Sequence, residues 1–168
     1  RAVFAVRQTD LAANKGKTGL WLENLRARDA APPVRFTDEA LNVNSPSFSP
    51  DGKTVYFLTA KSGSMQLWSQ SLQGKDAVQV SDLPLDVGSY KLSPDGRKIA
   101  FSLEVFADCA DLACTQKRLD ETAARKASGM LFDKLFVRHW DTYVDGRRSQ
   151  LFVARLEQGK LAAPERIA

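Results

Sequence analysis

Apolar and polar residues alternate in short runs along most of the chain, and one such run occurs twice. Residues 48–57 (FSPDGKTVYF) return as residues 92–101 (LSPDGRKIAF), a shift of 44 residues that keeps the apolar, turn and basic positions in register. Both runs are bounded by turn residues and are rich in β-branched and aromatic side chains, which favours β-strands. The pattern therefore predicts a repeated strand, over residues 54–59 and again over 98–103.

The Ser-Pro-Asp-Gly tetrad at residues 49–52 and 93–96 predicts a tight turn before each of these strands. Proline fixes φ at the first corner, and the Asp side chain can accept a hydrogen bond from nearby backbone. Glycine supplies the positive φ that closes a hairpin. Each tetrad is therefore expected to join two antiparallel strands.

Further strands follow each pair in the same order. A third strand carries a leucine followed by an aromatic residue, and a short fourth strand comes after the next turn. Phe4 is the counterpart of Phe57 and Phe101, so we expect a similar turn immediately before Arg1. The third strands contain Leu20-Trp21, Leu67-Trp68 and Leu151-Phe152, and the fourth span residues 34–37, 78–81 and 165–168.

Four strands in about 44 residues is the spacing of a β-propeller blade. The predicted fold is all-β, a partial propeller of about three four-stranded antiparallel blades filling residues 1–168. The first blade, residues 1–40, lacks its first strand; the second spans 41–84 and the third 85–168. The alternative is an antiparallel sandwich with two coincidentally similar hairpins. The ten matching positions and the aligned later strands favour the propeller.

An insertion at about residues 104–136 interrupts the third blade. Over residues 115–134 the apolar positions have helical spacing, which predicts an amphipathic helix with Thr115 as its N-cap and Gly129 at an end or kink. Such a loop elaboration either carries a recognition surface or packs on its own blade, and both readings stay open. The apolar positions are Leu119, Ala123, Ala127, Met130 and Leu131.

Cys109 and Cys114 are the chain's two cysteines and lie just before the predicted helix. A tetrahedral zinc site needs further Cys or His ligands, and the chain has a single histidine, so no metal site is expected. A disulfide between Cys109 and Cys114 would close a small ring and stiffen the start of the insertion. It would also indicate an oxidising compartment, so the expected location is periplasmic or secreted.

The sequence predicts no catalytic residue of its own. It lacks the Gly-x-Ser-x-Gly nucleophile motif and phosphate-binding or metal-binding motifs, so no cofactor is expected. His139 is interpreted as a core or interface residue, and Trp140-Asp141 as packing plus support for a turn. Glu104 and Asp108 could capture a cationic group if they face a substrate channel; the alternative is that both are solvated loop carboxylates.

Charge and hydropathy exclude two classes of partner. The chain has 24 Lys and Arg against 20 Asp and Glu, and the two signs are interspersed, which does not favour nucleic-acid binding. No run approaches the roughly 18 to 20 consecutive apolar residues that span a bilayer, so no membrane span is expected.

The two tetrads, with residues 135–143 (LFVRHWDTY) and 145–152 (DGRRSQLF), resemble the propeller of bacterial prolyl oligopeptidase family serine peptidases. The likeness is to the dipeptidyl peptidase and acylaminoacyl peptidase branch and covers essentially the whole chain. It implies a propeller that caps an α/β-hydrolase domain of the same protein and admits short peptides to a Ser-Asp-His triad. No triad residue has a match here, so the expected function is that of a non-catalytic gate.

Two other readings stay open. TolB-like propellers share the tetrads, so the chain could be a non-enzymatic propeller that binds a protein partner; a longer sequence without a downstream Gly-x-Ser-x-Gly would favour this reading. The chain could also be a deliberate three-blade protein. Because an open arc leaves apolar faces at both ends, the isolated chain is expected to associate with itself.

Overall fold

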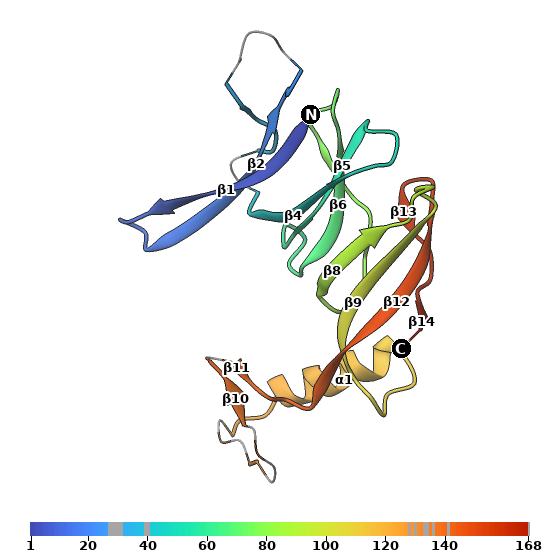
Figure 1. Cartoon of the computed structure of the whole chain (residues 1–168). Helices are drawn as coiled ribbons and strands as arrows, with labels where there is room; N and C mark the ends of the chain where they lie inside the picture. The colour runs from blue at the N-terminus through green and yellow to red at the C-terminus, as the bar shows by residue number, and fades with distance from the viewer. Residues whose placement is uncertain are drawn as a thin grey trace.

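A computed structural model shows a chain of antiparallel sheets with one helix (Figure 1). It describes residues 1–26, 32–38, 41–127, 129, 131–132, 135, 137–140 and 142–167. The all-β prediction with a single helix is confirmed. Among the described residues, no helix has the length and apolar character needed to cross a membrane.

Three sheets follow one another along the chain. The first has the order β1-β2-β3 and the second β4-β5-β6-β7, while the third has the order β13-β12-β9-β8 with β14 also paired to β12. The first contains β1 (Ala2–Asp10), β2 (Lys15–Glu23) and β3 (Val34–Arg35); the second contains β4 (Val43–Phe48), β5 (Thr54–Thr59), β6 (Gln66–Ser71) and β7 (Ala77–Gln79). The third contains β8 (Val87–Leu92), β9 (Lys98–Phe106), β12 (Arg147–Glu157), β13 (Lys160–Leu161) and β14 (Glu165–Arg166). A separate hairpin pairs β10 (Arg138–His139) with β11 (Thr142–Tyr143).

The register of the sheets follows the sequence repeat. The aromatic residue after each leucine lies directly opposite a phenylalanine on the neighbouring strand. These cross-strand pairs are Phe4 with Trp21, Phe57 with Trp68, and Phe101 with Phe152. Phe4 therefore occupies the position expected for a counterpart of Phe57 and Phe101, whereas the blade boundaries at residues 40 and 84 stay a prediction.

The first Ser-Pro-Asp-Gly turn has the expected hydrogen bonds. As expected, the Lys53 N–H donates to Asp51 Oδ1 at 3.1 Å and Gly52 has a φ of 67°; the Ser49 hydroxyl donates to the same carboxylate oxygen at 2.6 Å. The second turn repeats the bond between Ser93 and Asp95 at 2.6 Å. In both turns the pKa of the aspartate is lowered, first by the serine hydroxyl and then by a backbone N–H two residues on. The tetrad therefore holds its carboxylate in the ionised form.

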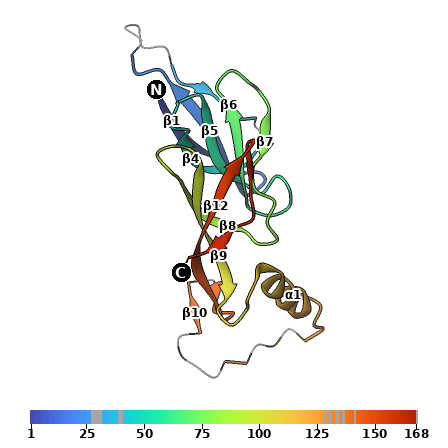
Figure 2. The same cartoon turned by 90° about the vertical axis from the view of Figure 1, so that its right-hand side faces the viewer.

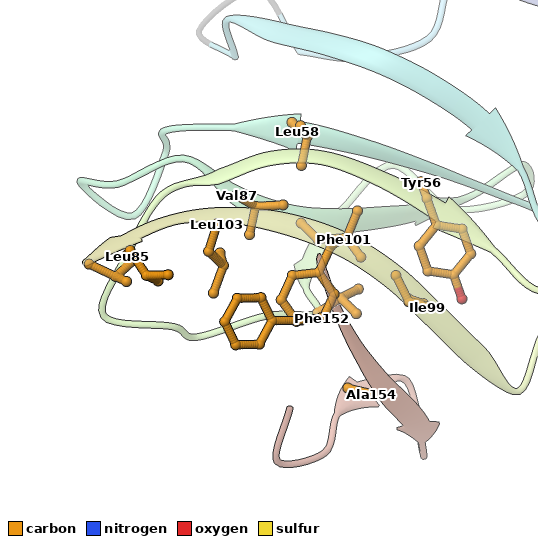
Figure 3. Close-up of a cluster of buried hydrophobic side chains, with 12 residues drawn as sticks. Tyr56, Leu58, Leu85, Val87, Ile99, Phe101, Leu103, Phe152 and Ala154 are labelled. Carbon is orange, nitrogen blue, oxygen red and sulfur yellow. The ribbon is translucent and has the colours of Figure 1, made fainter. Parts of the chain in front are cut away.

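Two hydrophobic cores fill the spaces between neighbouring sheets. Because successive side chains of a strand point to opposite faces, β5 serves both cores: Val55 and Phe57 pack toward the first sheet, and Tyr56 and Leu58 toward the third. Figure 3 shows the second of these cores, where Leu58 lies above side chains such as Phe101 of the third sheet. Sheets buried on both faces explain why their strands lack simple alternation.

Two buried glutamines of β6 join the second sheet to the chain segments on either side. Gln70 Nε2 donates to the carbonyl oxygen of Phe36, at 3.0 Å, in the segment that follows the first sheet. Gln66 Nε2 donates to the carbonyl oxygens of Leu83 and Leu85, at 3.0 and 3.1 Å, in the segment that leads to the third sheet. Both glutamine side chains are buried, so their hydrogen bonds are shielded from water.

The insertion differs from its prediction at two places. Strand β9 continues through Phe106, because residues 104–106 pair with the start of β12 instead of leaving the sheet. Helix α1 spans Leu112–Ala123, so the predicted range of 115–134 is wrong. Its N-cap is Asp111, whose carboxylate accepts the Cys114 N–H at 2.8 Å; Thr115 lies inside the helix and is fully buried.

The apolar positions beyond Ala123 do not continue the helix. Leu131 is non-helical and 98% exposed, and Met130 lies outside the described residues. Ala127 is exposed as well. Of the predicted apolar positions, Leu119 packs against the core of the sheet, and it is joined there by Leu112, which the prediction did not include.

Candidate functional site

The insertion leaves the third sheet at one defined end. β9 and β12 pair from Lys98 opposite Arg155 to Phe106 opposite Arg147, and continue past the end of β8. The Ser-Pro-Asp-Gly turn joins β8 to the start of β9, so the insertion lies at the opposite end of the sheet. In Figure 2, α1 and β10 lie at that lower end, away from the second sheet.

A disulfide and two hydrogen bonds hold the start of α1. The structure joins Cys109 and Cys114, whose Cα atoms are 5.6 Å apart, and Cys109 is buried. The Cys109 carbonyl oxygen accepts a hydrogen bond from Arg166 of β14 at 3.0 Å. Together with the Asp111 cap, these contacts fasten the helix to the edge of the third sheet.

Asp108 is engaged in an ion pair with the helix. Its two carboxylate oxygens accept hydrogen bonds from Arg118 Nη1 and Nη2 at 3.0 and 2.8 Å. The same guanidinium carbon lies 4.5 Å from the centre of the Phe106 ring, within cation–π range. Hydrogen bonding from Arg118 lowers the pKa of Asp108, so the carboxylate stays charged and paired. This geometry gives Asp108 a positioning role at the helix junction.

Glu104 lies on a different element from Asp108. It is an exposed residue of β9, directly opposite Ser149 of β12, on the face turned away from the second sheet. Of the two carboxylates predicted as candidates for binding a cationic group, Glu104 is the one without a guanidinium partner in the described part of the chain.

The β10–β11 hairpin presents aromatic and cationic side chains to solvent. Trp140 is 84% exposed and has a φ of 55°, which is unusual for a bulky residue, so the prediction that it is a packing residue is wrong. Tyr143 stacks on Phe132 at 5.9 Å, and the Arg138 guanidinium lies 5.9 Å from the Tyr143 ring. Trp, Tyr and Arg are the residues most enriched at binding hot spots.

His139 is an exposed neighbour of Trp140, with their ring centres 6.2 Å apart. His139 was predicted to be either a core residue or an interface residue. Because it is exposed, the core alternative is wrong, and the interface alternative stays a prediction. Asp141, predicted to support the turn, lies outside the described residues. The described residues contain no cluster of three metal-ligating side chains.

Solved structures with the same fold include two peptidase propellers. An acylaminoacyl peptidase from Pyrococcus horikoshii is 16% identical, with a TM-score of 0.65 over 98% of this chain and 23% of that one. The β-propeller domain of the Trilobed protease from Pyrococcus furiosus is 15% identical, with a TM-score of 0.53 over 99% and 39% of the two chains. These likenesses confirm the propeller fold.

Sequence comparison extends the likeness to homology. No family model matches, but Dipeptidyl-peptidase 5 from Porphyromonas endodontalis is 30% identical over 159 residues, which are 94% of this chain and 21% of that protein. The chain is homologous to the propeller portion of prolyl oligopeptidase family peptidases. The resemblance inferred from the tetrads and from the run around His139 is thereby confirmed.

This prolyl oligopeptidase family propeller shares its architecture with TolB proteins. TolB from Acinetobacter baumannii is 13% identical, with a TM-score of 0.56 over 99% of this chain and 30% of that one. The chain spans about a fifth of the length of the dipeptidyl peptidase that it matches (21%).

Proposed function

We propose that the chain is the non-catalytic propeller of a dipeptidyl- or acylaminoacyl-type serine peptidase and gates the access of short peptides to an α/β-hydrolase domain of the same protein. The observation that carries this proposal is the 30% identity to a dipeptidyl peptidase along 94% of the chain. Since the sequence has no Gly-x-Ser-x-Gly motif, the nucleophile in this proposal comes from the hydrolase domain.

In this proposal the insertion is the part of the propeller that contacts the incoming peptide. The disulfide, the Asp111 cap and the Asp108–Arg118 pair fix the direction of α1, and a binding surface works best when it is rigid before the ligand arrives. Glu104, exposed on β9 beside this junction, would bind the ammonium group of a peptide's free amino terminus. The disulfide also supports a periplasmic or secreted location.

The first test compares the full-length protein with this chain on chromogenic dipeptidyl and acylated amino-acid substrates. We expect the full-length protein to cleave and the 168-residue chain to be inert. In the full-length protein, Glu104→Gln should lower kcat/KM roughly tenfold for substrates with a free amino terminus, because one charge-assisted contact is lost. Acylated substrates, which carry no ammonium group, should be unaffected.

Glu157→Gln is the matched control, since Glu157 is an exposed carboxylate at the far end of β12. Equal losses for free and acylated substrates in Glu104→Gln would contradict the role given to Glu104. If the full-length protein cleaves neither substrate class, the peptidase proposal is withdrawn. The fold shared with TolB would then favour a non-enzymatic propeller that binds a protein partner.

A further inference from the structure

Helix α1 is packed in its first part and exposed at its end. Leu112 and Leu119 pack against the core of the third sheet, and Thr115 is fully buried. Every residue from Asp120 to Ala127 is exposed. Helical turns that lack tertiary packing are marginal in water, so the end of α1 opens at little cost in free energy while its start stays folded.

The last turn of α1 lacks the features that stabilise a helix end. Its C-cap is Ala124, with a right-handed φ of −73°, where many helices end on a left-handed glycine. This turn has no basic residue, whereas Asp120 and Glu121 place negative charge near the negative end of the helix dipole. Residues 125–127 then continue as exposed, non-helical backbone. The chain therefore leaves the helix without a stabilising cap.

Two adjacent basic residues lie at this exit from the helix. Arg125 and Lys126 directly follow the C-cap, and small residues flank them, with Ala123 and Ala124 before and Ala127 after. Trypsin-like serine peptidases select such side chains through a carboxylate in their specificity pocket. Exposed segments of small and polar residues are the preferred points of proteolytic cutting. Chemistry and exposure thus coincide at this pair.

A second basic pair in the same helix provides a contrast. Lys117 and Arg118 offer a peptidase the same side-chain chemistry, but they lie inside α1. The Arg118 guanidinium is bonded to Asp108 at 2.8 Å and lies over the Phe106 ring. A peptidase would have to unfold the packed part of the helix to reach this pair, so the structure protects one pair and presents the other.

We propose that the Arg125-Lys126 pair is a processing site for a trypsin-like serine peptidase. Water adds across the peptide bond that follows Arg125 or Lys126; the basic residue then ends in a carboxylate, and the next residue begins with an amino group. The inference goes beyond the proposed function and does not depend on it, because this chain is here the substrate of another enzyme.

The two pieces stay assembled after the cut. Strand β9 lies in the first piece and β12 in the second, and they pair along the whole of β9. Phe101 also stacks on Phe152 at 6.0 Å, and Arg166 donates to the Cys109 carbonyl oxygen at 3.0 Å. Cleavage therefore leaves the third sheet intact and separates α1 from the segment that leads to the β10–β11 hairpin.

The test is brief digestion of the folded full-length protein with trypsin, followed by amino-terminal sequencing of the products. Among the bonds of this chain, the one after Arg125 or Lys126 should be cut first, about tenfold or more faster than those after Lys117 and Arg118. The pieces should co-elute in gel filtration. In denaturant they should separate without a reductant, because Cys109 and Cys114 lie in the same piece.

Two exposed substitutions provide the controls. The double variant Arg125→Gln, Lys126→Gln should lose this cut, with the rate reduced about tenfold or more, whereas Lys117→Gln should be cut like the unmodified protein. Both should keep its far-ultraviolet spectrum, since the replaced side chains are exposed. The proposal is overturned if the two basic pairs are cut equally fast, if another bond of this chain is cut first, or if the folded full-length protein resists trypsin at this pair.

Discussion

Gly52 and Gly96 occupy the same place in the two Ser-Pro-Asp-Gly turns but have different surroundings. Both have positive φ, at 67° and 69°, a backbone conformation that costs an L-residue roughly 1–2 kcal/mol. A Cβ at Gly52 would meet nothing within 4 Å, whereas one at Gly96 would lie 3.3 Å from Cδ of Pro50 in the neighbouring turn. The second turn thus touches the first, and its glycine serves packing as well as conformation.

Replacement of each glycine by alanine should separate these two roles. We expect Gly52→Ala to lower the free energy of unfolding by about 1 kcal/mol, the cost of the left-handed conformation alone. Gly96→Ala should cost more, because the added methyl group also presses on Pro50. Urea denaturation of both variants measures the difference, and equal losses would show that the contact between the turns carries no energy.

At the scale of elements, the sequence specifies strands more fully than it specifies the helix. The strand over residues 54–59 is found as predicted because its apolar run and its flanking turn agree. The helical period of the insertion continues past residue 123, but residues 124–127 are exposed, so no packing supports further turns. Short helices depend on such packing more than on propensity. This is why periodicity alone placed the end of the helix too late.

The candidate site was predictable only where its residues are close in sequence. Cys109 and Cys114 are separated by 5 positions, so a bond between them could be inferred from spacing. The pairing of Asp108 with Arg118 could not, because it depends on where α1 begins. With Thr115 as the expected cap, Asp108 would lie well before the helix, and the sequence alone would not place it beside Arg118. Trp140 lies in the turn between β10 and β11, so its exposure depends on whether another part of the molecule covers this hairpin, and its local sequence does not carry that information.

Loss of the disulfide should loosen α1 and leave the sheets intact. Closing so small a ring is worth about 2 kcal/mol in the chain-entropy view. The double variant Cys109→Ala, Cys114→Ala should therefore speed amide hydrogen exchange in Leu112–Ala123, while exchange in β5 is unchanged. Chemical reduction of the unmodified chain should give the same pattern. Uniformly faster exchange across the sheets would mean instead that the bridge stabilises the whole molecule.

At the scale of the whole molecule, the buried apolar side chains gather in the two cores between neighbouring sheets. Residues at equivalent positions of different sheets are therefore expected to contribute differently to the free energy of unfolding, according to whether a neighbouring sheet covers them. Phe57 is fully buried in the joint between the first and second sheets, while Phe4, at the equivalent position, lies partly exposed on the outer face. The same side chain in the same strand position thus has two environments.

Phe57→Ala should lower the free energy of unfolding by about 3–5 kcal/mol, the usual cost of removing a buried aromatic side chain. Phe4→Ala should cost about 1 kcal/mol or less, since little buried surface is lost. Urea denaturation at concentrations where the chain is monomeric measures both. Comparable losses would indicate that the outer face of the first sheet is covered in solution by some other part of the chain.

The two buried glutamines of β6 bear on how such sheets can be exchanged between proteins. The described bonds from Gln66 and Gln70 to the adjoining segments end on main-chain carbonyl oxygens, those of Phe36, Leu83 and Leu85. Every amino acid supplies that acceptor, but the Gln66 amide oxygen also accepts a hydrogen bond from the Ser81 hydroxyl at 2.7 Å, so the contacts of Gln66 depend on one side chain of the adjoining segment. If the second sheet were grafted beside a foreign sheet, it would keep the bonds of Gln66 only if the segment with Ser81, Leu83 and Leu85 moved with it, whereas the bond of Gln70 needs only a backbone carbonyl oxygen in the position of that of Phe36.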